Sequence, residues 1–131
     1  MDITNLYTIL EQAETDPAVG IKVVRMTGDE GFSLFGAEIA GHKKVGAHYH
    51  DKGIETYQII EGRGVIHLGT PAHGGAVDWH ESLPVAAGDC FTVEQGQVHQ
   101  LENTAPTRLV AVFGCPTSHL GADRTMVDGR Q

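Results

Sequence analysis

Two histidines and a glutamate lie within eight residues in the stretch Gly46-Ala47-His48-Tyr49-His50-Asp51-Lys52-Gly53-Ile54-Glu55. On a β-strand, side chains at positions i and i+2 project from the same face, so His48 and His50 can share one metal ion. Glu55 follows a short turn and can supply a carboxylate as a third ligand. Imidazole nitrogen together with carboxylate oxygen suits iron, manganese, zinc, nickel or copper better than calcium or magnesium.

A fourth ligand is predicted in a second segment, residues 88–103. This segment reads as a strand, a glycine turn, a histidine at His99 and an asparagine four residues later. If the strands close a barrel, an inward-facing His99 can meet His48, His50 and Glu55 at one point.

The rest of the chain has the texture of an all-β protein. Short apolar or alternating runs, separated by turn signals about every 8–12 residues, predict a β-sandwich or barrel. The tail, residues 114–131, is predicted to be ordered at first and frayed at its end. The predicted strands are Ile21–Met26, Phe32–Ala40, Val45–His50, Glu55–Glu61, Val65–Leu68, Ala76–Leu83, Cys90–Val93, Val98–Glu102 and Arg108–Phe113.

Residues 1–16 predict a short helix ahead of the strands. Asn5 or Thr4 can cap its start, and Asp16 before Pro17 ends it, because a residue that precedes proline disfavours the helical region. One apolar stripe at positions i, i+3, i+4 and i+7 is formed by Leu6, Ile9, Leu10 and Ala13.

Composition narrows the class of protein. The 131 residues predict one domain, 1–131, with a barrel core at about 21–113. With 9 basic and 17 acidic residues the net charge is −8, which argues against nucleic acid or an anionic membrane as partner. We expect a cytoplasmic protein, since no signal-peptide pattern or long apolar run occurs. The isolated Cys90 and Cys115 read as reduced thiols, with one disulfide as the alternative.

The first segment resembles the first motif of the cupin superfamily. That motif carries H-x-H, three or four residues, E, six residues and G, which His48, His50, Glu55 and Gly62 match. The glycine that the motif places six residues before the first histidine falls on His42 here.

The second segment resembles the second cupin motif, G, five residues, P-x-G, two residues, H, three residues, N. Gly88, Gly96, His99 and Asn103 match it, and Glu94 stands at the usual proline. The resemblance implies a double-stranded β-helix, or jelly-roll, barrel. It also implies one divalent transition metal (Fe, Mn, Zn or Ni) with one or two open positions, held by His48, His50, Glu55 and His99.

Other polar residues receive weaker assignments. Tyr57 alternates with Glu55 and is expected to face inward, either packing in the core or contacting substrate. His67 is expected to point out of the barrel and to be exposed or to face a partner, and Cys90 to be a small core residue. Surface roles are favoured for His73 and His80, with a part in covering the site as the alternative, and His119 in the tail could fold over the mouth of the barrel but is assigned no role. Arg108 and Arg124 are the cations available for an anionic substrate, although solvated positions are favoured for both.

The ligands do not select a reaction. A tail of the form H-x-L-x-N, apolar strand, L-G-x-D is similar to the cupin domain of mannose-6-phosphate isomerases, which favours an isomerase or epimerase acting on a small sugar-like or carbonyl substrate. In that reading Glu55 and Tyr57 are the candidate catalytic residues. A non-haem Fe(II) dioxygenase and a non-catalytic binding or sensing module are the alternatives. The resemblance also implies a homodimer.

Overall fold

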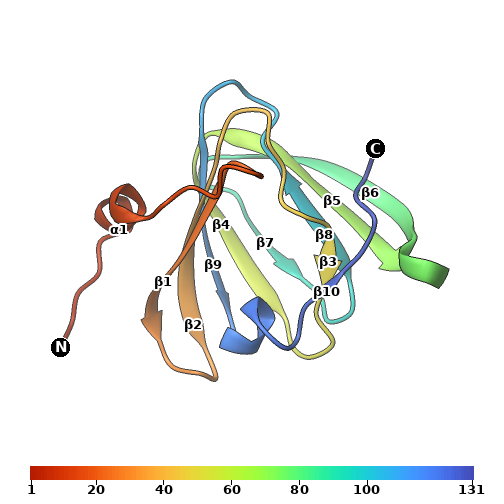
Figure 1. The fold of residues 1–131 in the computed structure, drawn as a ribbon, viewed down its shortest axis with the longest axis horizontal. Helices are drawn as coiled ribbons and strands as arrows, with labels where there is room; N and C mark the ends of the chain where they lie inside the picture. Colours follow the sequence, from red (N-terminus) through yellow and green to blue (C-terminus); the bar gives the residue numbers. More distant parts are fainter.

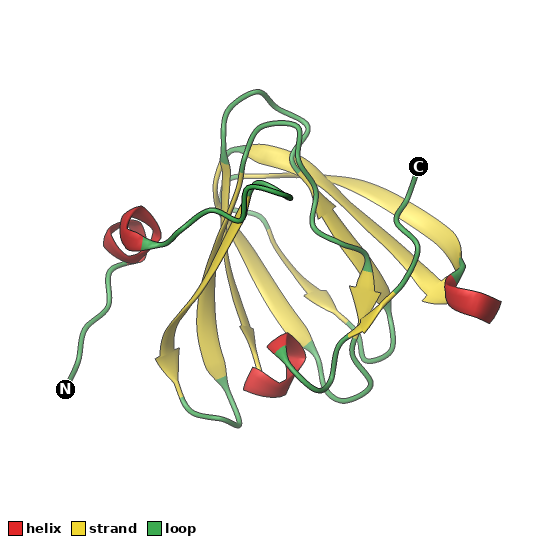
Figure 2. Ribbon diagram, in the orientation of Figure 1, coloured by secondary structure: helices red, strands yellow, loops and turns green.

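The structure, a computed structural model, describes residues 1–131. Strands account for most of the regular structure, with helices only at the edges (Figure 2). The elements are α1 (Leu6–Gln12), β1 (Ile21–Gly28), β2 (Ser33–Ile39), β3 (His48–Tyr49), β4 (Glu55–Glu61), β5 (Arg63–Pro71), η1 (His73–Gly75), β6 (Val77–Ala86), β7 (Cys90–Val93), β8 (Val98–Glu102), β9 (Leu109–Cys115), η2 (Thr117–Leu120) and β10 (Thr125–Met126).

The strands form two five-stranded antiparallel sheets in the orders β1-β2-β9-β4-β7 and β10-β3-β8-β5-β6. Most neighbours in these sheets are far apart in sequence, as a jelly roll requires. The sheets lie close together at one end and diverge at the other, where η2 lies between them (Figure 1). The predicted all-β jelly-roll fold with a short N-terminal helix is confirmed.

Apolar side chains between the sheets hold the two layers together. One cluster contains seven buried residues, and a second cluster lies toward the wide end with the Tyr57 ring packed against it. Because the interior-facing positions alternate along each strand, the same strands that build this core also aim polar side chains into the wide end. The second cluster is Phe35, Ala37, Phe113 and Cys115.

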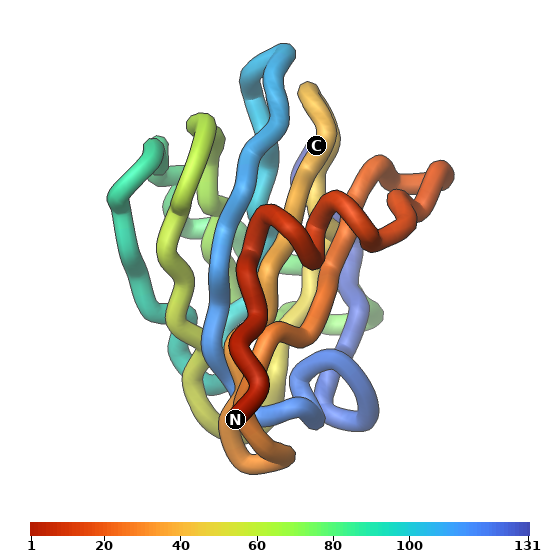
Figure 3. Tube along the Cα trace, turned by 90° about the vertical axis from the view of Figure 1, so that its left-hand side faces the viewer, coloured from red at the N-terminus to blue at the C-terminus, as the bar shows by residue number.

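The N-terminal helix is shorter than the sequence predicts. The Asn5 side chain accepts a hydrogen bond from Thr8 N, as expected of the cap, but Ala13 is already extended, so the helix ends well before Pro17. Leu10 alone is fully buried among its residues. The segment runs across the outer surface of the sheet that contains β1 and β2 (Figure 3). No helix in the chain has the length and apolar character needed to span a bilayer.

Several strands differ in extent from the prediction, and β5, predicted as Val65–Leu68, is the clearest extension, to Arg63–Pro71. The predicted strand Val45–His50 is reduced to His48–Tyr49, because Val45 N donates to Leu101 O in an irregular approach to the sheet. The tail is more ordered than predicted, since η2 and β10 both lie within it and β10 pairs with β3. These long-range contacts leave no periodic signal in a short segment.

The register of β7 corrects the prediction for Cys90. Val93 lies opposite Glu55 and Phe91 opposite Tyr57, so these two side chains face inward and Cys90 faces out. Cys90 is exposed rather than in the core, whereas Cys115 is buried, and both thiols are free.

His67 lies between polar neighbours, and its predicted exposure is wrong, because the side chain is only 8% exposed. Its ring nitrogens contact Ser82 Oγ at 2.7 Å and Glu102 Oε1 at 2.8 Å. The C-terminal residues also reach this cluster, since Arg130 donates to Ser82 Oγ and to the side chain of Gln100. Strand alternation fixes the face of a side chain but not whether another segment covers it.

His42 stands where the first cupin motif has a glycine. It is the only non-glycine residue with a positive φ, at 60°, in the left-handed region that favours glycine. The chain therefore keeps the backbone conformation at this position while paying a steric penalty for the side chain.

Replacing His42 with glycine is expected to stabilise the protein by about 0.5–1 kcal/mol, because relief of the left-handed strain exceeds the extra entropy of an unfolded glycine. The free energy of unfolding in urea measures the change. Lys43→Gly is the matched control, since Lys43 has no positive φ and should lose stability. Equal destabilisation by both substitutions would contradict the prediction.

Candidate metal centre

The four predicted ligands converge at the wide end of the barrel. Their donor atoms all lie within 4.8 Å of one another, and all four side chains are buried. β3 carries His48 and places it directly opposite His99 on β8. His50 follows β3, and Glu55 opens β4 in the facing sheet. The turn between the histidines and Glu55 thus carries the chain from one sheet to the other.

Backbone carbonyls orient the three imidazoles. The Nδ1 atoms of His48, His50 and His99 contact carbonyl oxygens at 2.7, 2.6 and 3.3 Å, with Nδ1 as the donor. This fixes the tautomer that leaves each Nε2 lone pair free to bind a metal. The carbonyls belong to Gly46, Asp123 and Gln97 respectively.

The free nitrogens fit a metal ion. Nε2 of His50 and Nε2 of His99 are buried without a hydrogen-bond partner. They lie 3.0 and 3.7 Å from oxygens of Glu55. Metal–ligand bonds of about 2.1 Å place neighbouring donors roughly 3 Å apart, which these separations approach. Buried polar atoms are rarely left unpaired, so the pattern favours a bound ion at this point.

The pKa directions of His48 and Glu55 agree with their ligand forms, whereas that of His50 does not: burial would lower the pKa of His50, but the nearby Glu55 carboxylate outweighs it and raises that pKa above its ordinary value. Burial, with the neighbouring His99, lowers the pKa of His48 to about 3, so the ring is neutral at pH 7. Burial alone would raise the pKa of Glu55, but the neighbouring His50 and His99 rings and the Tyr57 hydroxyl outweigh it and hold that pKa below its ordinary value. Neutral imidazole and ionised carboxylate are the forms that bind metals.

Two further side chains hold Glu55 in place. The Tyr57 hydroxyl donates to Glu55 Oε1, and His119 Nδ1 lies 2.9 Å from Glu55 Oε2. Burial, followed by the charge of Glu55, raises the pKa of Tyr57 well above its ordinary value, which keeps the donating proton in place. The Tyr57 ring is stacked between Phe91 and Phe113. The structure therefore directs the Tyr57 hydroxyl toward Glu55.

His119 is the site residue to which the sequence assigns no role. It lies in η2, is 1% exposed and stacks on His50 with 3.9 Å between ring centroids. Its Nε2 donates to Lys52 O at 2.6 Å, so one ring connects the tail, the turn and Glu55. A single histidine in an aperiodic tail gives no sequence signal for such a contact.

Asp123 also links the tail to the turn that follows His50. Its carboxylate accepts hydrogen bonds from the backbone N–H groups of Asp51 and Lys52, at 2.7 and 3.0 Å, and its carbonyl accepts from His50 Nδ1. We name residues 116–126 the C-terminal strap, because they reach from β9 across the wide end to β3. The strap supports both the orientation of His50 and the position of Glu55.

The strap predicts an effect of His119 on metal affinity. His119→Phe keeps a flat ring beside His50 but removes the donor to Glu55, so we expect metal affinity to fall roughly 10- to 100-fold. Competition titration with a zinc chelator measures this. His73→Ala, which changes an exposed histidine outside the cavity, is the control and should bind like wild type. Wild-type affinity of the phenylalanine variant would refute the role of His119.

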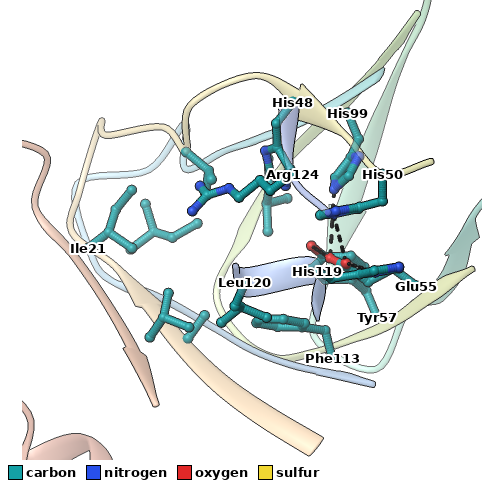
Figure 4. A pocket seen from close by; sticks show the side chains of 15 residues that line it. Ile21, His48, His50, Glu55, Tyr57, His99, Phe113, His119, Leu120 and Arg124 are labelled. Carbon is teal, nitrogen blue, oxygen red and sulfur yellow. Dashed lines mark hydrogen bonds and ion pairs between the residues drawn. The ribbon is translucent and has the colours of Figure 1, made fainter. Parts of the chain in front are cut away.

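A cavity of about 130 Å³ opens onto the cluster. Arg124 of the strap is exposed to solvent, as predicted, and lines the cavity beside the histidines, whereas Arg108 lies elsewhere and pairs with Glu38 and Glu61 (Figure 4). His73 and His80 are exposed and do not line the cavity. Both cations that the sequence singles out are thus exposed to solvent, but only Arg124 borders the cavity.

Several known proteins are similar to this chain in sequence or in fold. An oxalate-binding protein from Thermotoga maritima is 39% identical over 66 residues, 50% of this chain and 46% of the relative. The chain therefore spans about half the length of this curated relative. A solved oxalate oxidase superposes with a TM-score of 0.65 at 19% identity, covering 79% of this chain and 54% of the other. KdgF from Halomonas sp. gives a TM-score of 0.69 at 13% identity, over 88% and 94%.

At those identities the solved structures support the fold alone. The model of the cupin domain family matches residues 37–113, which contain all four residues of the histidine–glutamate cluster but neither β1 nor the C-terminal strap. The match covers more than half of the chain and agrees with the observed jelly roll. This chain belongs to the cupin domain family.

Proposed function

We propose that this protein holds one divalent transition metal through His48, His50, Glu55 and His99 and binds a small carboxylate as its substrate. The observation that carries the proposal is Arg124, a cation without a carboxylate partner that lines the same cavity as the four donors. A carboxylate could then reach the metal position with one oxygen and Arg124 with the other. The similarity to the oxalate-binding protein of Thermotoga maritima supports this class of ligand.

The bound metal would supply a Lewis acid that polarises a carbonyl or carboxylate oxygen. Arg124 would orient the anion through charge-assisted hydrogen bonds. The buried side chains around the four donors would keep water from the metal position, which strengthens the interaction of the anion with the metal.

Proton transfer by Glu55 and Tyr57, as an isomerase or epimerase would need, has weaker support. Both oxygens of Glu55 already have donors, Tyr57 and His119, and the Tyr57 hydroxyl is turned toward Glu55. We therefore assign Tyr57 a positioning role. Oxygen consumption by the Fe(II)-loaded protein in the presence of a carboxylate would identify a dioxygenase instead, and an unchanged ligand would identify a binding module. A cytoplasmic homodimer remains our prediction for location and assembly.

Metal analysis combined with ligand titration tests the proposal. Elemental analysis of the purified protein should find about one transition metal per chain. The loaded protein should bind pyruvate in calorimetry, and Arg124→Gln should weaken that binding about 10-fold or more, because a charge-assisted hydrogen bond is lost. Arg63→Gln is the control, since Arg63 is exposed and outside the cavity. Absence of metal binding, or unchanged pyruvate affinity in Arg124→Gln, would overturn the proposal.

A further inference from the structure

The cavity continues beyond the histidine–glutamate cluster into an apolar end. Apart from the cluster, Tyr57, His119 and Arg124, every residue that lines it is hydrophobic. Figure 4 shows Ile21 at the far side of the cavity from His50 and Glu55, with Arg124 between them. The apolar lining residues are Ile21, Val23, Ala37, Ile39, Val45, Leu101, Phe113 and Leu120.

Two aliphatic side chains at the rim of this end are open to solvent. Val23 is 45% exposed and Leu120 is 38% exposed, although the cavity floor includes the fully buried Ile39. Single exposed aliphatic residues are common on protein surfaces. Here they border one cavity whose opposite end is polar, and a ligand that covers them would remove apolar surface from water.

The polar groups are all gathered at one end. Ile21 and Val23 on β1, together with Leu120 on the strap, offer no side-chain donor or acceptor. A wholly polar anion held at the cluster would leave this end filled by water without partners on the walls. An apolar substituent on the same anion would fill it favourably, as in most small-molecule sites, where a few polar groups orient a ligand against apolar walls.

We propose that the substrate is an amphiphilic organic acid. Its carboxylate, with an adjacent oxo or hydroxy oxygen, lies at the metal position and Arg124, and an aliphatic or aromatic substituent lies against Ile21, Val23 and Leu120. This inference rests on the proposed function and narrows it. It separates this protein from one built for oxalate, which has two carboxylates and no apolar part.

A ligand series tests the substituent directly. The metal-loaded full-length chain is titrated by calorimetry with oxalate, pyruvate, 4-methyl-2-oxopentanoate and phenylpyruvate. Affinity should rise about 10- to 100-fold from pyruvate to the two larger acids, because their added carbon atoms become buried. Equal affinity for all three oxo acids, or tightest binding of oxalate, would overturn the inference. In those two cases pyruvate binding that still depends on Arg124 leaves the proposed function intact.

Variants at the cavity rim test whether the higher affinity for the larger acids comes from Val23 and Leu120. Val23→Ser and Leu120→Ser should each reduce the preference for 4-methyl-2-oxopentanoate over pyruvate, measured as a ratio of affinities in the same metal-loaded variant, by about 3-fold or more. Val19→Ser is the matched control, because Val19 is 43% exposed but lies outside the cavity. An unchanged preference in both rim variants would overturn the inference. So would a wild-type dimer that dissociates on Val23→Ser, since a second copy would then cover this rim.

Discussion

Replacement of His99 by alanine is expected to remove nearly all metal binding. His99 carries one of the three Nε2 atoms of the cluster, is 2% exposed and lies directly opposite His48 in the sheet. Loss of a direct ligand should exceed the roughly 100-fold loss that follows from removing an outer hydrogen bond. The rise in melting temperature on adding zinc, which reports binding to the folded state, should disappear.

Comparing the stability of the zinc-free and zinc-loaded protein separates loss of metal binding from loss of folding. Without metal, the alanine variant should already be less stable than wild type, because it loses the Nδ1 contact with Gln97 O and leaves a space at a buried position; the zinc response is therefore measured against the variant's own metal-free melting temperature. His80→Ala alters an exposed histidine and should keep the full zinc response. A normal zinc response in His99→Ala would remove this residue from the site.

Asn103→Ala is expected to cost about 2–4 kcal/mol of stability. The side chain is completely buried, and its Nδ2 contacts the carbonyls of Ile39, Ala40 and Thr107 at 2.9, 3.2 and 2.8 Å. Its Oδ1 also accepts a hydrogen bond from Ala105 N. Alanine would leave several buried backbone groups unpaired, and each unpaired group costs roughly 1–3 kcal/mol.

Urea denaturation measures the loss, with Asn5→Ala as the matched control. Asn5 caps the short helix α1 at the surface, so its loss should cost about 1 kcal/mol or less. A cost for Asn103→Ala no larger than that of the control would show that the loop at 103–107 does not depend on this amide.

The sequence predicts the barrel and the histidine–glutamate cluster well for a physical reason. His48 and His50 are two residues apart on one strand, and such local spacing determines which face carries a side chain. His99 and Asn103 occupy a motif with a glycine turn whose geometry is also local. The strand ends are less accurate because the last pairing partners are set by tertiary contacts.

The contributions of the C-terminal strap are the part that sequence could not supply. His119 and Asp123 act on Glu55 and His50 across more than sixty positions of sequence, and no local pattern encodes such pairs. His67 illustrates the same limit, since alternation places it on the outer face but cannot show that polar neighbours and the tail bury it. Arg124 is visible in the sequence as a cation, but only the fold separates it from Arg108.

The weak attachment of the C-terminal strap to the barrel should affect the rate at which metal leaves the cluster. Its only ladder with the barrel is the two-residue pairing of β10 with β3, whereas the sheets behind it are paired over whole strands. Segments with so few backbone pairs open by local unfolding at a fraction of the global free energy. Opening of the strap would release Arg124 and His119 together. The rate of strap opening, measured by amide hydrogen exchange in this segment, should therefore limit the rate of metal loss while the barrel stays folded.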